Sequence, residues 1–339
     1  MAETAPLNVT LYMRPNCGLC DEVRKQLTEL RQDYPHRLAE VNIDSDAVLQ
    51  KKYFDQIPVL EVGPYVLRAP ITRQQLMMTL GAARDRRDQL TETGGEGYRA
   101  RVRKGQKTGF SDGVYFWLSK HYLALVNLIL FIYVGLPFAA PVLMKAQAPG
   151  VARIIYKVYS PLCHQFAFRS FFLFGEQPYY PLKEAGLANV QSYEAISGST
   201  DVANPYSVSR LTARQYTGNE TVGFKVALCE RDVAIYGAML LFGLVYAATQ
   251  RKMPALHWLA WILLALGPIG LDGVSQIVSQ FNFPWLAQIL PYRESTPFLR
   301  VLTGGLFGFG TAWFAFPNIE ESMKETRQFF IKKLAVARA

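Results

Sequence analysis

The chain has 339 residues, of which half are hydrophobic and 19% are charged, and its net charge is +9. Four cysteines are too few for a small scaffold held by disulfides, and the mean hydropathy of +0.07 is high for a soluble chain with so many Lys and Arg residues. The length and composition together indicate two domains, one polar and one very apolar.

The polar part is predicted to be a small α/β domain over residues 7–82. Strand-like and helix-like patterns alternate there in the order βαβαββα. The strand-like runs lie at 7–13, 36–44, 57–62 and 65–69, and helical spacing occurs at 18–33, 45–54 and 73–85. The N-terminal stretch MAETAPLNVT lacks both a basic segment and an apolar run, so it does not resemble a cleavable signal peptide. We therefore expect this domain in the cytoplasm.

Residues 83–113 are rich in charge and glycine and lack apolar periodicity. They predict a linker between a first domain at 1–82 and a membrane domain at 114–339. The basic run at 98–104 comes shortly before an apolar segment, where it can meet anionic lipid head groups. The basic charge therefore requires no nucleic-acid partner.

Four apolar segments predict membrane-spanning helices. The clearest covers 121–144 and contains no Asp, Glu, Lys or Arg, and a span needs about 20 such residues. The other three cover 233–249, 254–271 and 301–318. Glycines and other small residues at 301–310 suit close helix packing in lipid. We therefore predict an all-α, polytopic membrane domain with about four spans in contact with membrane lipids.

The orientation of these spans is predicted from Lys and Arg. These residues gather before the first span, between the second and third, and after the fourth. With four spans the three segments share one side, which the positive-inside rule assigns to the cytoplasm. Both termini are then cytoplasmic, and residues 145–232 and 272–300 face the outside.

The motif RPNCGLCDE at 14–22 follows a predicted strand and opens a helix. A helix N-terminus stabilises a thiolate at Cys17, and Cys20, one turn further on, can resolve a mixed disulfide. A structural zinc pair and two inert thiols are the alternatives for a Cys-x-x-Cys motif taken alone.

The elements LYMRPNCGLCDEV, VNIDSD and QIPVLEVG resemble the glutaredoxin-like branch of the thioredoxin superfamily. The resemblance implies a thioredoxin-like fold with Cys17 as nucleophile and Cys20 as resolving thiol. It also implies a cis proline at Pro58 that faces the thiols. GPYVLRAPIT stands where that family commonly has a Gly-Gly-x-Asp stretch, which argues against glutathione as the partner without excluding it.

A second set of polar residues lies at the predicted outer ends of the spans. Its members come from separate stretches of sequence: Arg169, Arg231, Asp272, Gln276, Arg293, Glu294 and Arg300. Charges at membrane depth are costly unless they pair, so these residues are expected to converge. Two interpretations stay open, namely a structural ion network that joins helix ends and a functional site.

Two cysteines in the same region suggest a metal site. The candidate zinc ligands are two thiols, an imidazole and a carboxylate, from Cys163, His164, Cys229 and Asp232. A Cys163–Cys229 disulfide and two unrelated buried thiols are the alternatives.

Residues from about 155 to 316 resemble a bacterial and archaeal family of small predicted membrane proteins whose function is not established. The elements that carry the resemblance are CHQ, RSFF, CERD followed by VAIYG, LDGVSQ, and REST followed by PFLRVLTGG. The family commonly has a second cysteine where this chain has Asp232, which favours a metal or polar site over a redox pair there. We expect a multi-pass protein of the bacterial cytoplasmic (inner) membrane.

Three functions are compatible with these features. The first is a membrane-anchored thiol-disulfide oxidoreductase that acts on a cytoplasmic thiol protein, with quinone as a further electron partner. About 30 Å of hydrocarbon would separate Cys17 from Cys163 and Cys229, which excludes direct exchange between them. The second is a non-catalytic subunit of a larger respiratory or photosynthetic membrane complex, with other membrane subunits as partners. The third is a transporter or lipid-head-group enzyme that uses Asp272 and the arginines.

Overall fold

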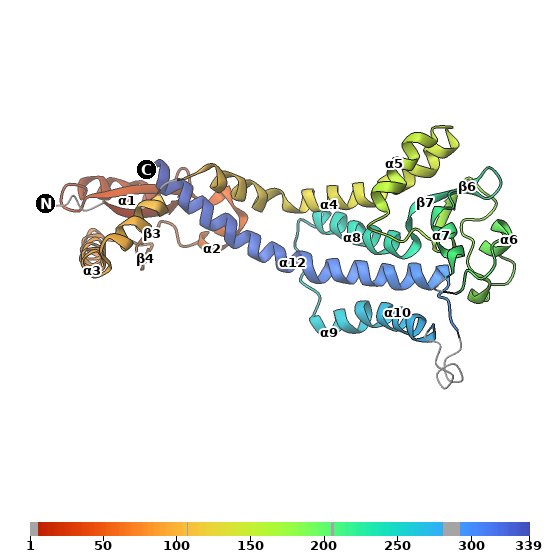
Figure 1. Cartoon of the computed structure of the whole chain (residues 1–339). Coiled ribbons are helices and arrows are strands. Elements are labelled where there is room, and N and C mark those ends of the chain that lie inside the picture. The colour runs from red at the N-terminus through yellow and green to blue at the C-terminus, as the bar shows by residue number, and fades with distance from the viewer. Residues whose placement is uncertain (1–5, 107, 205–206, 281–291) are drawn as a thin grey trace. The chain divides into compact units, whose positions relative to one another are not determined.

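A computed structural model describes residues 6–106, 108–204, 207–280 and 292–339. The chain divides into two compact units. One consists of Met1–His121 with Glu321–Ala339, and the other is Tyr122–Glu320. Figure 1 gives the element labels.

The first unit contains a four-stranded sheet in the order β2-β1-β3-β4. The strands are β1 (Leu7–Met13), β2 (His36–Asn42), β3 (Val59–Val62) and β4 (Tyr65–Arg68). β1 pairs with β2 in parallel, and the β1–β3 and β3–β4 pairs are antiparallel. The helices are α1 (Gly18–Glu29), α2 (Ala47–Tyr53) and α3 (Arg73–Gln106), with a short 3₁₀ turn η1 (Ile43–Ser45). The predicted order βαβαββα is confirmed.

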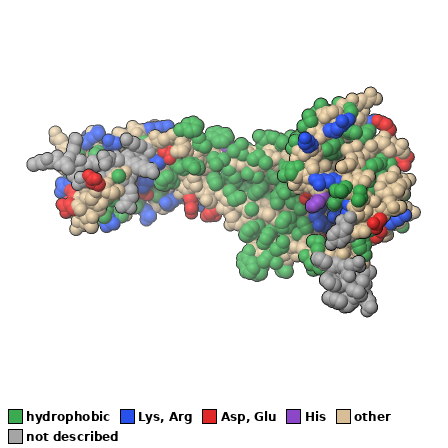
Figure 2. Space-filling view, in the orientation of Figure 1, with side chains coloured by type: hydrophobic (Ala, Val, Ile, Leu, Met, Phe, Trp, Pro, Cys, Tyr) green, Lys and Arg blue, Asp and Glu red, His purple; other side chains and the backbone are tan. Residues whose placement is uncertain are grey.

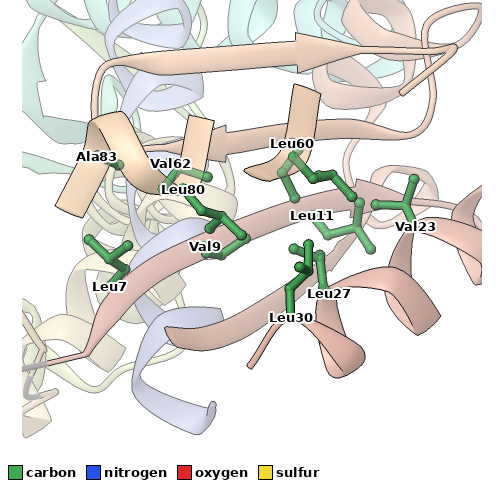
Figure 3. Close-up of a cluster of buried hydrophobic side chains, with 11 residues drawn as sticks. Leu7, Val9, Leu11, Val23, Leu27, Leu30, Leu60, Val62, Leu80 and Ala83 are labelled. Atoms are coloured by element: carbon green, nitrogen blue, oxygen red, sulfur yellow. The ribbon is translucent and has the colours of Figure 1, made fainter. Parts of the chain in front are cut away.

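The two faces of this sheet have separate cores, because successive strand residues point to opposite faces. On one face Val9, Leu11 and Leu60 are fully buried, together with side chains of α1 and α3 (Figure 3). On the other face Tyr12, Val59 and the side chains of α2 pack together with Ile331 and Ala335. The C-terminal part of the chain therefore completes the second core, which the sequence did not reveal.

Residues 83–113 are helical as far as Gln106, where α3 ends, and the backbone is non-helical at Gly95. The next helix begins at Phe110. The boundaries 1–82, 83–113 and 114–339 stay predictions.

Four described helical segments are long and apolar enough to cross a membrane, which confirms the predicted number. They are α4 (Phe110–Lys145), α8 (Glu230–Ala248), Trp258–Ser279 and α12 (Pro297–Arg338). The third consists of α9 (Trp258–Trp261), a π-helical turn η4 (Ile262–Leu266) and α10 (Gly267–Ser279). Only 17–28% of each apolar window is buried, and Figure 2 shows apolar side chains covering these helices. Such a surface suits contact with lipid tails.

Within the second unit, helices α8 and α12 pack against each other at very short distances. A Cβ atom at Gly308 would lie 2.0 Å from the carbonyl oxygen of Ile235, and one at Gly304 would lie 2.9 Å from that of Arg231. These glycines are four residues apart, as in helix pairs that pack closely in membranes. α8 lies beside α12 in Figure 1, and α4 and α10 lie next to the same pair.

The segment between α4 and α8 is not all helical, which corrects the prediction of an all-α membrane domain in this detail. It contains α5 (Pro149–Tyr159), η2 (Ala167–Arg169), β5 (Ser170–Leu173), η3 (Lys183–Ala185), α6 (Tyr193–Ser197), α7 (Val208–Gln215), β6 (Gly218–Asn219) and β7 (Gly223–Cys229). The strands form an antiparallel sheet in the order β5-β7-β6. β7 has the sequence GFKVALC, an apolar run that is too short for a span and suits a buried strand.

Candidate functional site

The Cys-x-x-Cys motif lies in the turn from β1 to α1. Cys17 is the N-cap residue of α1, and its Sγ accepts a hydrogen bond from the backbone N–H of Cys20 at 3.3 Å. The two cysteines form a disulfide. Cys20 is fully buried, whereas Cys17 is half-buried. A partner thiol can therefore reach the sulfur of Cys17 but not that of Cys20.

Pro58 stands at the same end of the sheet. Its peptide bond with Ile57 is cis, as the resemblance implied. Val59 follows it and pairs with Tyr12, close to where β1 ends and the motif begins. The exposed surface near the motif is partly apolar, because Leu19 is 55% exposed and Phe54, which lies under the Arg14 guanidinium, is 60% exposed.

A second group of reactive side chains, called here the thiol–carboxylate group, consists of Cys163, Cys229 and Asp232. One sulfur or oxygen atom of each lies within 4.8 Å of the others. Cys163 follows α5, Cys229 ends β7, and Asp232 lies in the first turn of α8. The thiol of Cys229 shares a hydrogen bond with Cys163, which lowers the pKa of Cys163 and raises that of Cys229.

Gln165 holds the two cysteine-bearing segments together. Its side-chain amide donates to the carbonyl oxygens of Tyr156 in α5 (3.0 Å) and Ala227 in β7 (2.9 Å). The backbone N–H of Gln165 also reaches the sulfur of Cys163 at 3.5 Å. The glutamine of the CHQ element therefore positions the thiols.

Lys225 is a completely buried lysine close to these thiols. Its ammonium donates to the carbonyl oxygens of Gln165 (2.7 Å) and Arg214 (2.8 Å), and burial lowers its pKa to about 7. Sequence reasoning missed this residue. A single lysine inside the apolar run GFKVALC was the signal that could have indicated it.

The structure does not bring His164, predicted as a ligand beside Cys163, into the thiol–carboxylate group. The imidazole of His164 instead stacks on Phe166, with 5.6 Å between the ring centroids. Adjacent residues outside a helix direct their side chains differently, which places His164 away from the sulfur of Cys163.

Glu294 is the centre of a buried ion network. Its carboxylate forms a bidentate ion pair with Arg169 and a second ion pair with Arg300. It also accepts a hydrogen bond from the side-chain amide of Gln276 at 2.7 Å. Arg300 is also 3.2 Å from Glu230. These contacts join four stretches of the sequence, around residues 169, 230, 276 and 294–300.

Asp272 is the second centre of the network. It pairs with Arg231 and with Arg293, whose Nη2 lies 2.7 Å from its carboxylate. The hydroxyl of Ser295 donates to the same carboxylate at 2.8 Å. All seven predicted polar residues therefore take part in ion pairs or hydrogen bonds around Glu294 or Asp272. The start of α8 contributes to the thiol–carboxylate group through Cys229 and Asp232 and to the ion network through Glu230 and Arg231.

Comparison with known proteins identifies both parts of the chain. Residues 8–81 match the profile of a family described as "Glutaredoxin-like domain (DUF836)", and residues 221–314 match that of "Predicted membrane protein (DUF2085)". The chain joins a glutaredoxin-like domain to a predicted membrane protein domain.

Part of the chain is also similar to a curated protein. An uncharacterised protein of Methanocaldococcus jannaschii is 23% identical over 209 residues, which are 59% of this chain and 93% of that protein. No solved structure matches the chain significantly. A glutaredoxin-like domain with a Cys17–Cys20 pair, joined to a membrane domain, fits a membrane-associated redox protein.

Proposed function

We propose that the chain is a membrane-anchored thiol–disulfide exchange protein in which Cys17 attacks and Cys20 resolves. The observation that carries this proposal is the asymmetry of the pair. Cys17 is half-buried at the N-terminus of α1, whereas Cys20 is fully buried one turn further along the helix. The backbone N–H of Cys20 and the helix dipole favour a thiolate at Cys17 in the reduced form.

The reaction proceeds in two balanced steps. The Cys17 thiolate attacks a substrate disulfide, forms a mixed disulfide with one substrate sulfur and releases the other as a thiolate. Cys20, as its thiolate, then attacks the sulfur of Cys17 and releases the second substrate thiol. The substrate gains two electrons, and the protein is left with the Cys17–Cys20 disulfide. A dithiol protein or two molecules of glutathione reduce this disulfide in the reverse sense.

The test uses full-length protein in detergent with a soluble disulfide peptide. The wild-type chain is expected to turn the peptide over when a dithiol reductant is supplied. Cys17→Ser should lose turnover and form no adduct. Cys20→Ser should accumulate a peptide adduct on Cys17, because the resolving step is absent. Equal turnover in Cys17→Ser and wild type would overturn the proposal. If excess dithiol does not reduce the Cys17–Cys20 disulfide of the wild-type chain, the proposal is also overturned. The domain would then have a structural role within a larger complex.

We further propose that both termini face the cytoplasm of the bacterial inner membrane. The supporting observation is that basic residues gather on the side of the chain termini and of the loop between α8 and α9, including Arg251 and Lys252. The test labels intact spheroplasts and inverted vesicles with a membrane-impermeant maleimide. Cys17, in the reduced protein, should react only in inverted vesicles. A cysteine at the exposed position of Thr200→Cys should react only in spheroplasts. Labelling of both from one side would contradict this topology.

A further inference from the structure

We propose that Cys163, Cys229 and Asp232 bind one zinc ion at the start of α8. The site lies in the membrane protein domain and is separate from the Cys17–Cys20 pair in both sequence and compact unit. The proposal rests on the convergence of three donor atoms, on the elements that position them, and on the charge that they bring together.

The donor atoms are close enough to share an ion. One ligand atom from each side chain lies within 4.8 Å of the other two. In a tetrahedral site with Zn–S bonds of about 2.3 Å and Zn–O bonds of about 2.0–2.2 Å, ligand atoms are separated by roughly 3.5–3.8 Å. The ligand atoms are therefore within about 1 Å of the separations that such a site requires.

Regular structure positions two of the three ligands, and side-chain hydrogen bonds position the third. Cys229 ends β7, where it pairs with Ser170 of β5, and it is also the N-cap residue of α8. Asp232 lies three residues further on, in the first turn of that helix, which places it on the same side as Cys229. Cys163 is drawn to this point by the two hydrogen bonds from the Gln165 amide. Ligands on packed elements, such as Cys229 and Asp232, form more exact metal sites than ligands on free loops.

The charges around the group favour a cation. Within the described part of the chain, no lysine or arginine forms an ion pair with Asp232, although the other acidic residues nearby, Glu230, Asp272 and Glu294, all have arginine partners. The buried ammonium of Lys225 is directed to backbone carbonyls of Gln165 and Arg214. A divalent ion would supply the positive charge that no ion pair supplies to Asp232 among the described residues, and it would bind the two thiols as thiolates.

The chemistry of the donors selects zinc. Thiolates are soft ligands that favour zinc over the hard ions magnesium and calcium. A disulfide between Cys163 and Cys229 would use both sulfurs and leave Asp232 without a partner, whereas a metal uses all three side chains. Three protein ligands leave a fourth position for water or another small donor.

The experiment measures metal content in full-length protein purified in detergent from cells grown with zinc. Wild type is expected to hold about one zinc per chain. Cys163→Ser and Cys229→Ser should lose most of it, and Asp232→Asn should retain the ion more weakly against a chelator. His164→Ala should keep the zinc, because its ring stacks on Phe166 instead. A Cys17→Ser, Cys20→Ser double variant should also keep it.

A spectroscopic measurement keeps the test decisive if the cysteine variants fold poorly. Wild-type protein stripped of zinc and loaded with cobalt(II) should show the intense thiolate-to-cobalt absorption that sulfur ligands produce. Absence of that absorption, together with absence of zinc, would overturn the proposal. Zinc that survives Cys163→Ser but is lost from the Cys17/Cys20 double variant would place the metal at the other cysteine pair. A mass that shows an intact Cys163–Cys229 disulfide would also overturn it.

Discussion

Arg169 binds both carboxylate oxygens of Glu294, although the two residues lie 125 positions apart. Its Nε is 2.7 Å from Oε1, and its Nη2 is 2.9 Å from Oε2. Glu294 is completely buried, and Arg169 is about one-quarter exposed. The pair joins the RSFF segment to the start of α12. Removal of one partner would leave a buried charge, so the contact holds this end of the membrane domain in register.

We expect the two-point hydrogen bonding of the Arg169 guanidinium, in addition to its charge, to stabilise the membrane domain. Arg169→Lys keeps a positive charge but cannot make two parallel hydrogen bonds, so the free energy of unfolding should fall by about 1–2 kcal/mol. Arg169→Met should cost about 3 kcal/mol or more, because Glu294 then loses an ion-pair partner in a buried site. Tryptophan fluorescence during denaturant unfolding in detergent measures both. The exposed Arg153→Lys is the matched control, and equal destabilisation by the two lysine variants would contradict this account.

Contact between α8 and α12 is expected to depend on Gly308. A methyl group there would lie 2.0 Å from the carbonyl oxygen of Ile235, so Gly308→Ala must push the helices apart. The cost should be about 1–3 kcal/mol of unfolding free energy, as for other overpacked contacts. Gly305→Ala is the control, because nothing lies within 4 Å of that position. It should be neutral or stabilising by up to about 1 kcal/mol. A Gly308→Ala variant as stable as Gly305→Ala would show that the helices are not this close.

Much of this architecture could be predicted from local sequence. Cys17 and Cys20 stand between a strand-like run and a helical pattern, and the apolar runs are long enough to identify four spans. The polar residues could be grouped as well, because helix ends on one side of a membrane must lie near each other. Arg169 pairs with Glu294, and Asp272 pairs with Arg231 and Arg293, so residues from separate stretches of sequence do meet.

The features that could not be predicted from the sequence depend on tertiary packing. Nothing local distinguishes the direction of His164 from that of Cys163, since the fold of the CHQ turn decides it. Lys225 is tolerated inside an apolar strand because its ammonium donates hydrogen bonds to two carbonyl oxygens. The C-terminal residues are charged and resemble a solvated tail in sequence, yet Ile331 and Ala335 pack against the sheet.

Acid is expected to destabilise the glutaredoxin-like domain through His36. Burial lowers the pKa of His36 below its ordinary value of 6.5, although Nδ1 donates to the carbonyl oxygen of Tyr34 at 2.6 Å. The folded domain therefore binds a proton less readily than the unfolded chain, so stability present above about pH 6.5 is lost as the pH falls through the lowered pKa.

Amide hydrogen exchange of the β2 peptide in the full-length protein measures this effect. After correction for the intrinsic rate, exchange should be faster at pH 5.5 than at pH 7.5 in wild type. The difference should shrink in His36→Gln and persist in the exposed-histidine control His121→Gln. An unchanged pH dependence in His36→Gln would assign the effect to other groups.

The C-terminal part of α12 is expected to stabilise the glutaredoxin-like domain. Ile331 packs into the core formed by Tyr12, Val59 and their neighbours, and Lys332 pairs with Glu61 of β3. Ile331→Asp places a carboxylate against this apolar core and should destabilise it by about 2–4 kcal/mol. Faster amide exchange in β3 of the full-length protein would report the loss, and the slow exchange of α8 should persist. Phe329→Asp changes a side chain that is 61% exposed and should leave β3 as protected as in wild type. Equal exchange in the two variants would mean that α12 does not support the sheet, whereas selective loss in Ile331→Asp would show that the last membrane-spanning helix continues into the core of the redox domain.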